Sequence, residues 1–213
     1  MSDEKKKWFD MKLQSLDILV CSGNGDLSKK IMWFNRLTGV KGKAAELSHT
    51  ARIYKGYLSH DLEVVESTTL NSWTLPPKKG VQRNPFEQWL DNYNGKVWAI
   101  QLDFERNKEF YDADFEFWQK HKNDRYENGI LGLSELLLCE FRLDKIVRLI
   151  LPKYRPLATK NPHCSELIVK FLQWHKFLSS SVIPSRFPPN VFWPDRELYK
   201  YIKLPIARPV RIK

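Results

Sequence analysis

The spacing of apolar residues predicts four strands, three of them early in the chain. The apolar run Leu16–Val20 is typical of a buried strand. In Leu47–Tyr54 every second residue from Leu47 is apolar except His49, which shares their face. Because successive strand residues point to opposite sides, we expect one apolar face with His49 directed inward. Leu62–Ser67 and Val97–Phe104 also have strand patterns.

Apolar residues three and four positions apart predict helices between and after these strands. The segment Ser22–Asp26 has the composition of a turn, and Asp26 can cap a helix that ends at Thr38-Gly39. Later helices are predicted over Asp112–Lys122, over Ile130–Leu151 with a break, and from Asn161-Pro162 through Trp174 toward Ser179. The proline-rich tail from Pro184 is expected to be extended on the surface. Strands first and helices later favour an α+β fold.

The composition indicates a folded protein with a basic surface. The 213 residues are 42% hydrophobic and carry a formal net charge of +10, so we expect one domain over 1–213 rather than a disordered chain. Three cysteines are too few for a disulfide framework. The first twenty residues lack the apolar core of a secretory signal, and no apolar run is long enough to cross a membrane. A cytoplasmic protein is therefore expected.

Cys164 is the candidate nucleophile. If Asn161 caps the last helix, Cys164 lies in the first turn, where free backbone N–H groups and the helix dipole favour an anion. This setting lowers the pKa of a thiol and makes the thiolate available for attack. A cysteine is also a common buried apolar residue, and helix position alone favours that simpler interpretation.

His49 and Glu66 are the candidate base and its partner. An inward histidine on a strand can accept a proton from a nucleophile at a helix start, although a core histidine bonded to a carbonyl is the simpler alternative. Glu66 is the only charged residue on its strand face and needs a partner if buried. A hairpin turn centred on Leu58 places Ser67 opposite His49, which brings Glu66 close. The alternative is an edge-strand glutamate that reaches solvent.

The other cysteines and histidines are predicted to have no chemical role. Cys21 lies at a strand end and Cys139 in an apolar helix. His163 precedes Cys164 but is expected to point away, because neighbours on a helix are about 100° apart. The spacing of Cys and His matches no zinc-ligand pair, so neither a metal nor another cofactor is predicted.

Four motifs, taken in order, resemble the YiiX/YebB-like group of papain-like cysteine hydrolases, the circularly permuted branch of the NlpC-type superfamily. They are Asp17-Ile18-Leu19, Ser48-His49, Val65-Glu66-Ser67 and Cys164-Ser165-Glu166-Leu167. The resemblance covers about 16–67 and 160–200, whereas a middle segment of about 70–155 diverges. Leu16 stands where the family usually has glycine. Tyr126 resembles the family's cleft tyrosine, although the preceding glycine and proline are absent.

The resemblance implies a papain-like α+β fold, in which an antiparallel sheet packs against the helix that bears the nucleophile. It also implies a Cys164-His49-Glu66 triad that cleaves a peptide, amide or lipid-like substrate through a thioester acyl-enzyme. Aromatic residues of the middle segment could line an acyl groove, although ordinary core is the favoured interpretation. They are Trp73, Phe86, Trp89, Trp98, Phe115 and Trp118.

Other functions stay open at this stage. A papain-like module can be inactive and only bind its ligand. Alternatively, basic residues of one loop and of the tail could bind nucleic acid or an anionic surface. They are Lys78, Lys79, Arg83, Arg208, Arg211 and Lys213. Interspersed acidic residues and the lack of a nucleic-acid motif favour an ordinary solvated surface instead. The permuted family also occurs in viruses and phages, so a virion or host-directed role is a further alternative.

Overall fold

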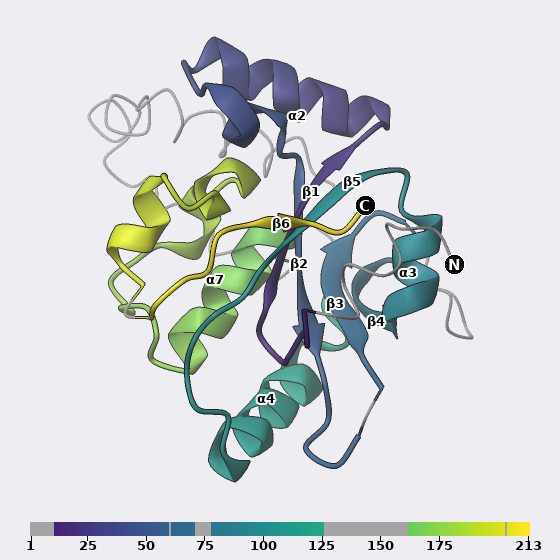
Figure 1. Cartoon of the computed structure of the whole chain (residues 1–213), viewed down its shortest axis with the longest axis vertical. Coiled ribbons are helices and arrows are strands. Elements are labelled where there is room, and N and C mark those ends of the chain that lie inside the picture. The colour runs from purple at the N-terminus through teal and green to yellow at the C-terminus, as the bar shows by residue number, and fades with distance from the viewer. Residues whose placement is uncertain (1–10, 60, 71–77, 126–161, 203) are drawn as a thin grey trace.

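A six-stranded antiparallel sheet forms the centre of the molecule (Figure 1). The computed structural model describes residues 11–59, 61–70, 78–125, 162–202 and 204–213. The strands are β1 (Ile18–Gly23), β2 (His49–Tyr54), β3 (Glu63–Thr68), β4 (Gly80–Pro85), β5 (Gly95–Ile100) and β6 (Val210–Arg211). Their order across the sheet is β4-β3-β2-β1-β5-β6. The predicted α+β class is therefore confirmed.

Helices cover both faces of this sheet. The described α-helices are α2 (Asp26–Leu37), α3 (Phe86–Asn92), α4 (Lys108–His121) and α7 (Cys164–Trp174). Alternate strand residues enter two separate cores: Ile18 and Val20 pack with α4 and α7, whereas Leu19 and Ala51 pack with α3. Helix α7 contacts β2 and β3, as expected for the helix that bears Cys164. Within the described residues, no helix is long and apolar enough to cross a membrane.

The strand predicted over Leu47–Tyr54 has the expected apolar face with Ala51 and Ile53, and its polar face is buried as well. Arg52 points toward the α7 side, where its guanidinium donates to both carboxylate oxygens of Asp114 on α4 at 2.7 and 3.1 Å. The same guanidinium lies over the ring of Phe171 on α7, 3.8 Å from the ring centroid. Both charged side chains are fully buried. This pair thus joins β2, α4 and α7.

Several predicted boundaries differ from the structure. Strand β1 continues through Ser22 and Gly23, which were assigned to a turn, and Gly25 rather than Asp26 is the N-cap of α2. Helix α4 begins at Lys108 because the side chain of Asn107 accepts a hydrogen bond from the Phe110 N–H. Strand β4 and helix α3 had no clear signal in the sequence. The predicted helix over Ile130–Leu151 lies outside the described residues.

The tail does more than cover the surface. It forms three short 3₁₀ helices, Pro184–Arg186, Pro189–Phe192 and Glu197–Lys200, before β6 pairs with β5. Phe192 and Leu198 are fully buried in the core beside α7. The expectation of an extended surface segment is therefore wrong, because apolar residues between the prolines complete the core.

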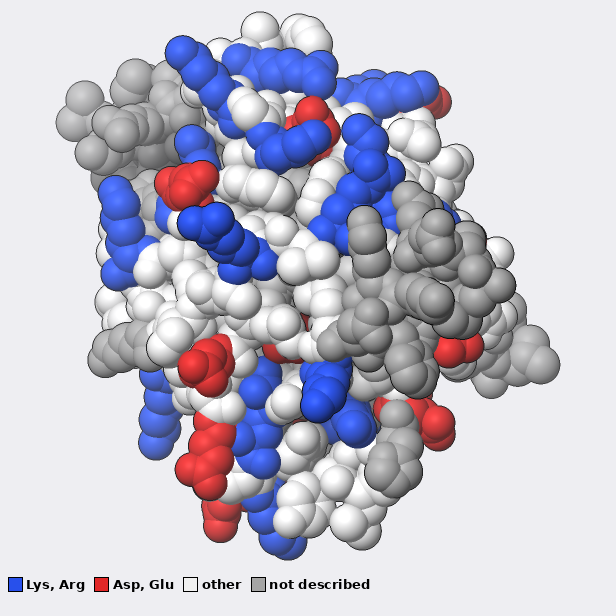
Figure 2. All heavy atoms as spheres, in the orientation of Figure 1, with Lys and Arg blue, Asp and Glu red and all other residues white. Residues whose placement is uncertain are grey.

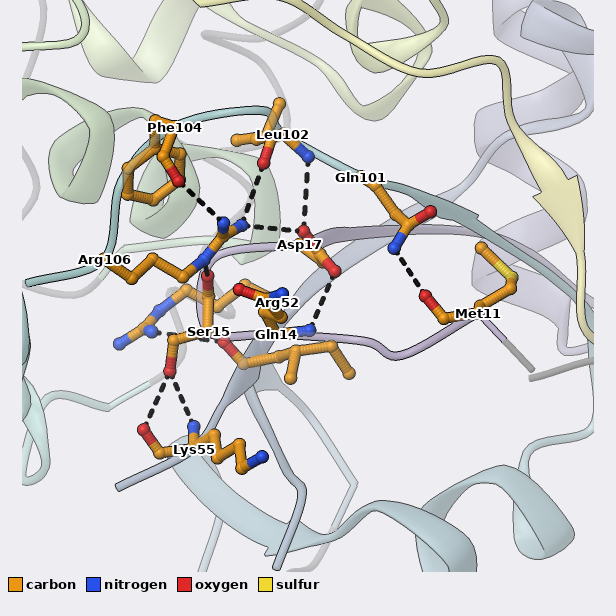
Figure 3. A network of polar contacts seen from close by, with 11 residues as sticks. Met11, Gln14, Ser15, Asp17, Arg52, Lys55, Gln101, Leu102, Phe104 and Arg106 are labelled. Atoms are coloured by element: carbon orange, nitrogen blue, oxygen red, sulfur yellow. Dashed lines mark hydrogen bonds and ion pairs between the residues drawn. The ribbon is translucent and has the colours of Figure 1, made fainter. Parts of the chain in front are cut away.

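A polar network fastens the start of β1 to the chain beyond β5 (Figure 3). Asp17 is 1% exposed, and its carboxylate accepts hydrogen bonds from the N–H groups of Gln14 and Leu102 and from the Arg106 guanidinium. Arg106 also donates to the carbonyl oxygens of Ser15, Phe104 and Leu102. These bonds satisfy a carboxylate that would otherwise be costly to bury. Asp17, the first residue of the quoted motifs, therefore has a structural role.

Candidate active site

Three elements bring the predicted site residues to one end of the sheet. His49 begins β2, Glu66 lies near the end of the antiparallel strand β3, and Cys164 is the first residue of α7. All three line one cavity of about 380 Å³. A short bond fixes the start of α7 over β3, since the Ser67 hydroxyl donates to the Pro162 carbonyl oxygen at 2.5 Å. The structure thus places the three residues together.

Glu66 holds the His49 ring by one nitrogen. The Glu66 Oε2 atom lies 2.7 Å from His49 Nε2. Its other oxygen, Oε1, accepts hydrogen bonds from Gln82 Nε2 and Trp89 Nε1, each at 3.0 Å. Glu66 is 4% exposed, and β3 is an inner strand of the sheet. The alternative of an edge-strand glutamate in solvent is therefore wrong.

The observed strand register differs by one residue from the expected one. Arg52 pairs with Val65, and continuing this register places Thr68, not Ser67, opposite His49. Glu66 is then the diagonal neighbour of His49 on the same sheet face, a position within reach of long side chains. Glu66 still reaches His49 despite the one-residue difference in register, because its side chain is long enough to span the diagonal.

His163, not Asn161, is the N-cap of helix α7. Its Nδ1 accepts a hydrogen bond from the Glu166 N–H at 3.2 Å and lies 3.0 Å from the Ser165 hydroxyl. Asn161 lies outside the described residues. Cys164 is consequently the first helical residue, and its N–H has no acceptor within the helix. The helix-start setting predicted for Cys164 is thus obtained with a different cap.

The electrostatics of the site favour a thiolate beside an imidazolium. Burial opposes charge on Cys164, but His49 and His163, through charge and hydrogen bonds, together hold the pKa of the thiol well below its ordinary value of 9.0. Burial likewise opposes charge on His49, yet Cys164 and Glu66 raise the pKa of the imidazole above its ordinary 6.5. His163, which was predicted to point away from Cys164, contributes to this lowering of the thiol pKa, while its Nδ1 atom accepts from the Glu166 N–H.

Two further residues adjoin the site and were not singled out from the sequence. Cys21 is the direct cross-strand partner of His49. Tyr93 follows α3, and its ring stacks on the His49 ring with centroids 6.4 Å apart. Burial raises the pKa of both the Tyr93 hydroxyl and the Cys21 thiol. Only the register of β1 against β2 could have revealed these neighbours.

Several other predicted features have structural roles or are not described. Phe86, Trp89 and Trp98 are buried, in accord with the preference for ordinary core, although Trp89 also borders the cavity. Phe115 is half-exposed on α4. Tyr126, Cys139 and Trp73 lie outside the described residues. Across the described ranges, no three His, Cys, Asp or Glu side chains cluster as a metal site requires.

The basic residues proposed for nucleic-acid or lipid binding are largely engaged within the fold. Lys78 donates to the Lys122 carbonyl oxygen at 2.5 Å, and Arg83 pairs with Glu63 at 3.1 Å. The Lys213 ammonium donates to two carbonyl oxygens at the end of α3. These contacts do not favour a free cationic surface at that loop or at the tail.

Comparisons with known proteins assign no family to the chain. No family model and no curated protein matches it. Among solved structures, the chain is similar to the crystal structure of the metalloprotein YiiX from Escherichia coli O157:H7, with a TM-score of 0.49 and 15% sequence identity. The match covers 76% of this chain and 66% of that one, so the chain spans slightly less than two thirds of that structure's length.

Proposed function

We propose that the chain is a cysteine hydrolase that cleaves an amide or ester bond through a thioester acyl-enzyme. Cys164 is the nucleophile, His49 the general base and acid, and Glu66 the partner that orients the imidazole. The observation that carries the proposal is one imidazole shared by two groups. His49 Nε2 lies 2.7 Å from Glu66, while the Cys164 thiol lines the same cavity and raises the pKa of the same imidazole.

Each step of the proposed reaction uses one of these groups. Because Glu66 occupies Nε2, the Nδ1 atom of His49 is left to take the thiol proton. The thiolate attacks the carbonyl carbon, and the backbone N–H of Cys164 at the helix start stabilises the oxyanion. The imidazolium then protonates the leaving amine or alcohol as the carbonyl re-forms. Water, deprotonated by His49, attacks the thioester, and the thiolate leaves beside the imidazolium, which restores the starting pair.

Cavity and burial support the same assignment. The cavity gives a carbonyl substrate access to residues that are themselves mostly buried: Cys164 is 5% exposed, and the His49 side chain is 15% exposed. Removing water from the site strengthens the charged pair and the oxyanion contacts. A merely structural cysteine in an apolar core would have a raised pKa, as Cys21 does.

The test compares two Cys→Ala variants that differ only in which cysteine is replaced. A vinyl sulfone probe should label the native chain and Cys21→Ala at equal rates near neutral pH, and should leave Cys164→Ala unlabelled. Cys164→Ala should also lose all turnover of a panel of acyl esters and peptide amides while keeping its melting temperature. Turnover retained in Cys164→Ala would refute the assignment. Labelling of Cys164 without turnover of any panel member would favour the binding-only alternative.

A further inference from the structure

Helix α2 has one fully buried anchor, which is polar, while Ile31, Met32 and Phe34 are half-buried. Asn35 is its only buried residue. The side-chain N–H of Asn35 donates to the Leu47 carbonyl oxygen at 2.9 Å, and its Oδ1 accepts from Asn190 at 2.7 Å. A helix on a globular protein ordinarily directs an apolar stripe inward, so this arrangement leaves the other apolar residues of α2 for another purpose.

Those apolar residues lie on the solvent side. Leu27, Trp33 and Leu37 are 41%, 61% and 55% exposed. At about 100° per residue, Trp33 and Leu37 lie about 40° apart, and Leu27 is about 80° further round. Lys30 falls between Leu37 and Leu27 on this arc. The outer face of α2 thus combines exposed apolar side chains with Lys30 and with Asp26 of the first turn, which falls between Trp33 and Leu37 in angular position.

Basic residues surround this face. Segment 26–46 holds five basic residues, Lys29, Lys30, Arg36, Lys41 and Lys43, and two acidic residues, Asp26 and Glu46. In the space-filling view, Lys and Arg atoms gather over α2 with uncharged atoms between them (Figure 2). The excess of positive charge requires an anionic partner, and the exposed Trp and Leu side chains require an apolar one.

We propose that α2 is a docking surface for membranes that contain anionic lipids. Trp33, Leu37 and Leu27 enter the boundary between headgroups and acyl chains, while the surrounding Lys and Arg side chains bind lipid phosphates. Helices that lie in a membrane interface combine these same features. A second protein copy fits less well, because lysine is depleted from the cores of protein interfaces. A nucleic acid would leave the apolar arc without a partner.

The surface adjoins the candidate active site. Leu27, Ser28 and Ile31 of α2 line the cavity that holds His49 and Cys164. Docking through α2 therefore brings the mouth of the cavity to the membrane surface. The link between docking and catalysis rests on the proposed function. Membrane binding itself does not, so binding is measured on the Cys164→Ala chain.

The test is co-sedimentation of Cys164→Ala with phosphatidylcholine vesicles that contain or lack phosphatidylserine. Binding is expected only with phosphatidylserine. Adding Lys29→Gln and Lys30→Gln should weaken it about 25-fold, because each cation near an anionic surface contributes roughly fivefold. Adding Trp33→Ala and Leu37→Ala should weaken it at least about tenfold, because their apolar area no longer leaves water. The melting temperature should not change, since all four side chains are outside the core.

Matched control variants lie at the other end of the sheet. Leu58→Ala removes an 89% exposed leucine from the loop between β2 and β3, and Lys108→Gln removes an exposed lysine from α4. Both should bind vesicles as the parent does. Equal binding to the two vesicle types, or equal losses in control and α2 variants, would overturn the proposal. So would binding of DNA or RNA that needs the lysines but not Trp33, or a dimer that Trp33→Ala and Leu37→Ala abolish.

Discussion

The His49 ring couples the three residues of the site through their charge states. The lowered pKa of Cys164 and the raised pKa of His49 describe one proton that has moved from sulfur to imidazole. A lowered thiol pKa keeps the thiolate present as the pH falls below 9.0. A raised imidazole pKa keeps the imidazolium present as the pH rises above 6.5. Both directions favour the charged pair in the neutral range.

This charge state predicts an unusual pH dependence for alkylation. Iodoacetamide should react with Cys164 at a rate that is already on its plateau at pH 7, whereas an ordinary thiol needs a pH near 9. In His49→Ala the inflection should move up toward 9.0, because the main cation that lowers the thiol pKa is gone. Mass-spectrometric rates between pH 5 and 10 measure the shift.

Cys21 serves as the internal reference for that profile. Burial raises its pKa, so it should stay unlabelled over the same range in both chains. Identical inflections with and without the His49 imidazole would mean that the ring does not act on the sulfur.

The sequence, together with the motif resemblance, was sufficient to identify the candidate site residues but not the residues that hold them in place. Cys164, His49 and Glu66 are chemically distinctive at a helix start and on strand faces. Gln82 and Trp89, which bind Glu66, come from a strand and a helix that had no periodic signal of their own. The role of His163 was missed because Asn161 is the commoner type of N-cap. Such partners depend on register and packing, which no local pattern contains.

Among the elements, α7 and β2 must keep a fixed spacing if Cys164 and His49 are to meet. The buried pair of Arg52 and Asp114 lies at this junction, and the guanidinium covers Phe171 of α7. Such a pair is satisfied only while both partners are present. The pair of Arg52 and Asp114 also explains why the polar side of β2 is buried.

Removing one partner of this pair should be costly. Asp114→Ala leaves the Arg52 charge buried without its carboxylate, and we expect a loss of about 3–5 kcal/mol of unfolding free energy. Asp112→Ala, on the same helix, breaks an exposed ion pair with Lys108 and should leave the urea midpoint unchanged. Equal midpoints for the two variants would show that the buried pair does not stabilise the junction.

Across the fold, burial is unevenly shared between the sheet and α2. Every residue of β1 is buried, and so are all residues of β2 and β3 after the first, so the strands that carry His49 and Glu66 are well enclosed. Early strands and an α+β class followed from period-two patterns. The exposure of the outer face of α2 could not be predicted from the sequence, because Leu27, Ile31 and Phe34 have the spacing of a core-facing stripe. Only the placement of the helix by Asn35 shows that Leu27, Trp33 and Leu37 face solvent.

This contrast predicts a gradient in amide hydrogen exchange. Opening α2 exposes little apolar surface, whereas opening β1 or β2 disrupts both cores, so α2 amides should exchange orders of magnitude faster than those of the central strands. Vesicles that contain phosphatidylserine should then slow exchange in α2 and leave β1 and β2 unchanged. Mass spectrometry of peptic peptides measures both effects in one experiment. Protection of α2 equal to that of β1 without lipid would mean that its outer face is already covered, and the docking surface would have to be sought elsewhere.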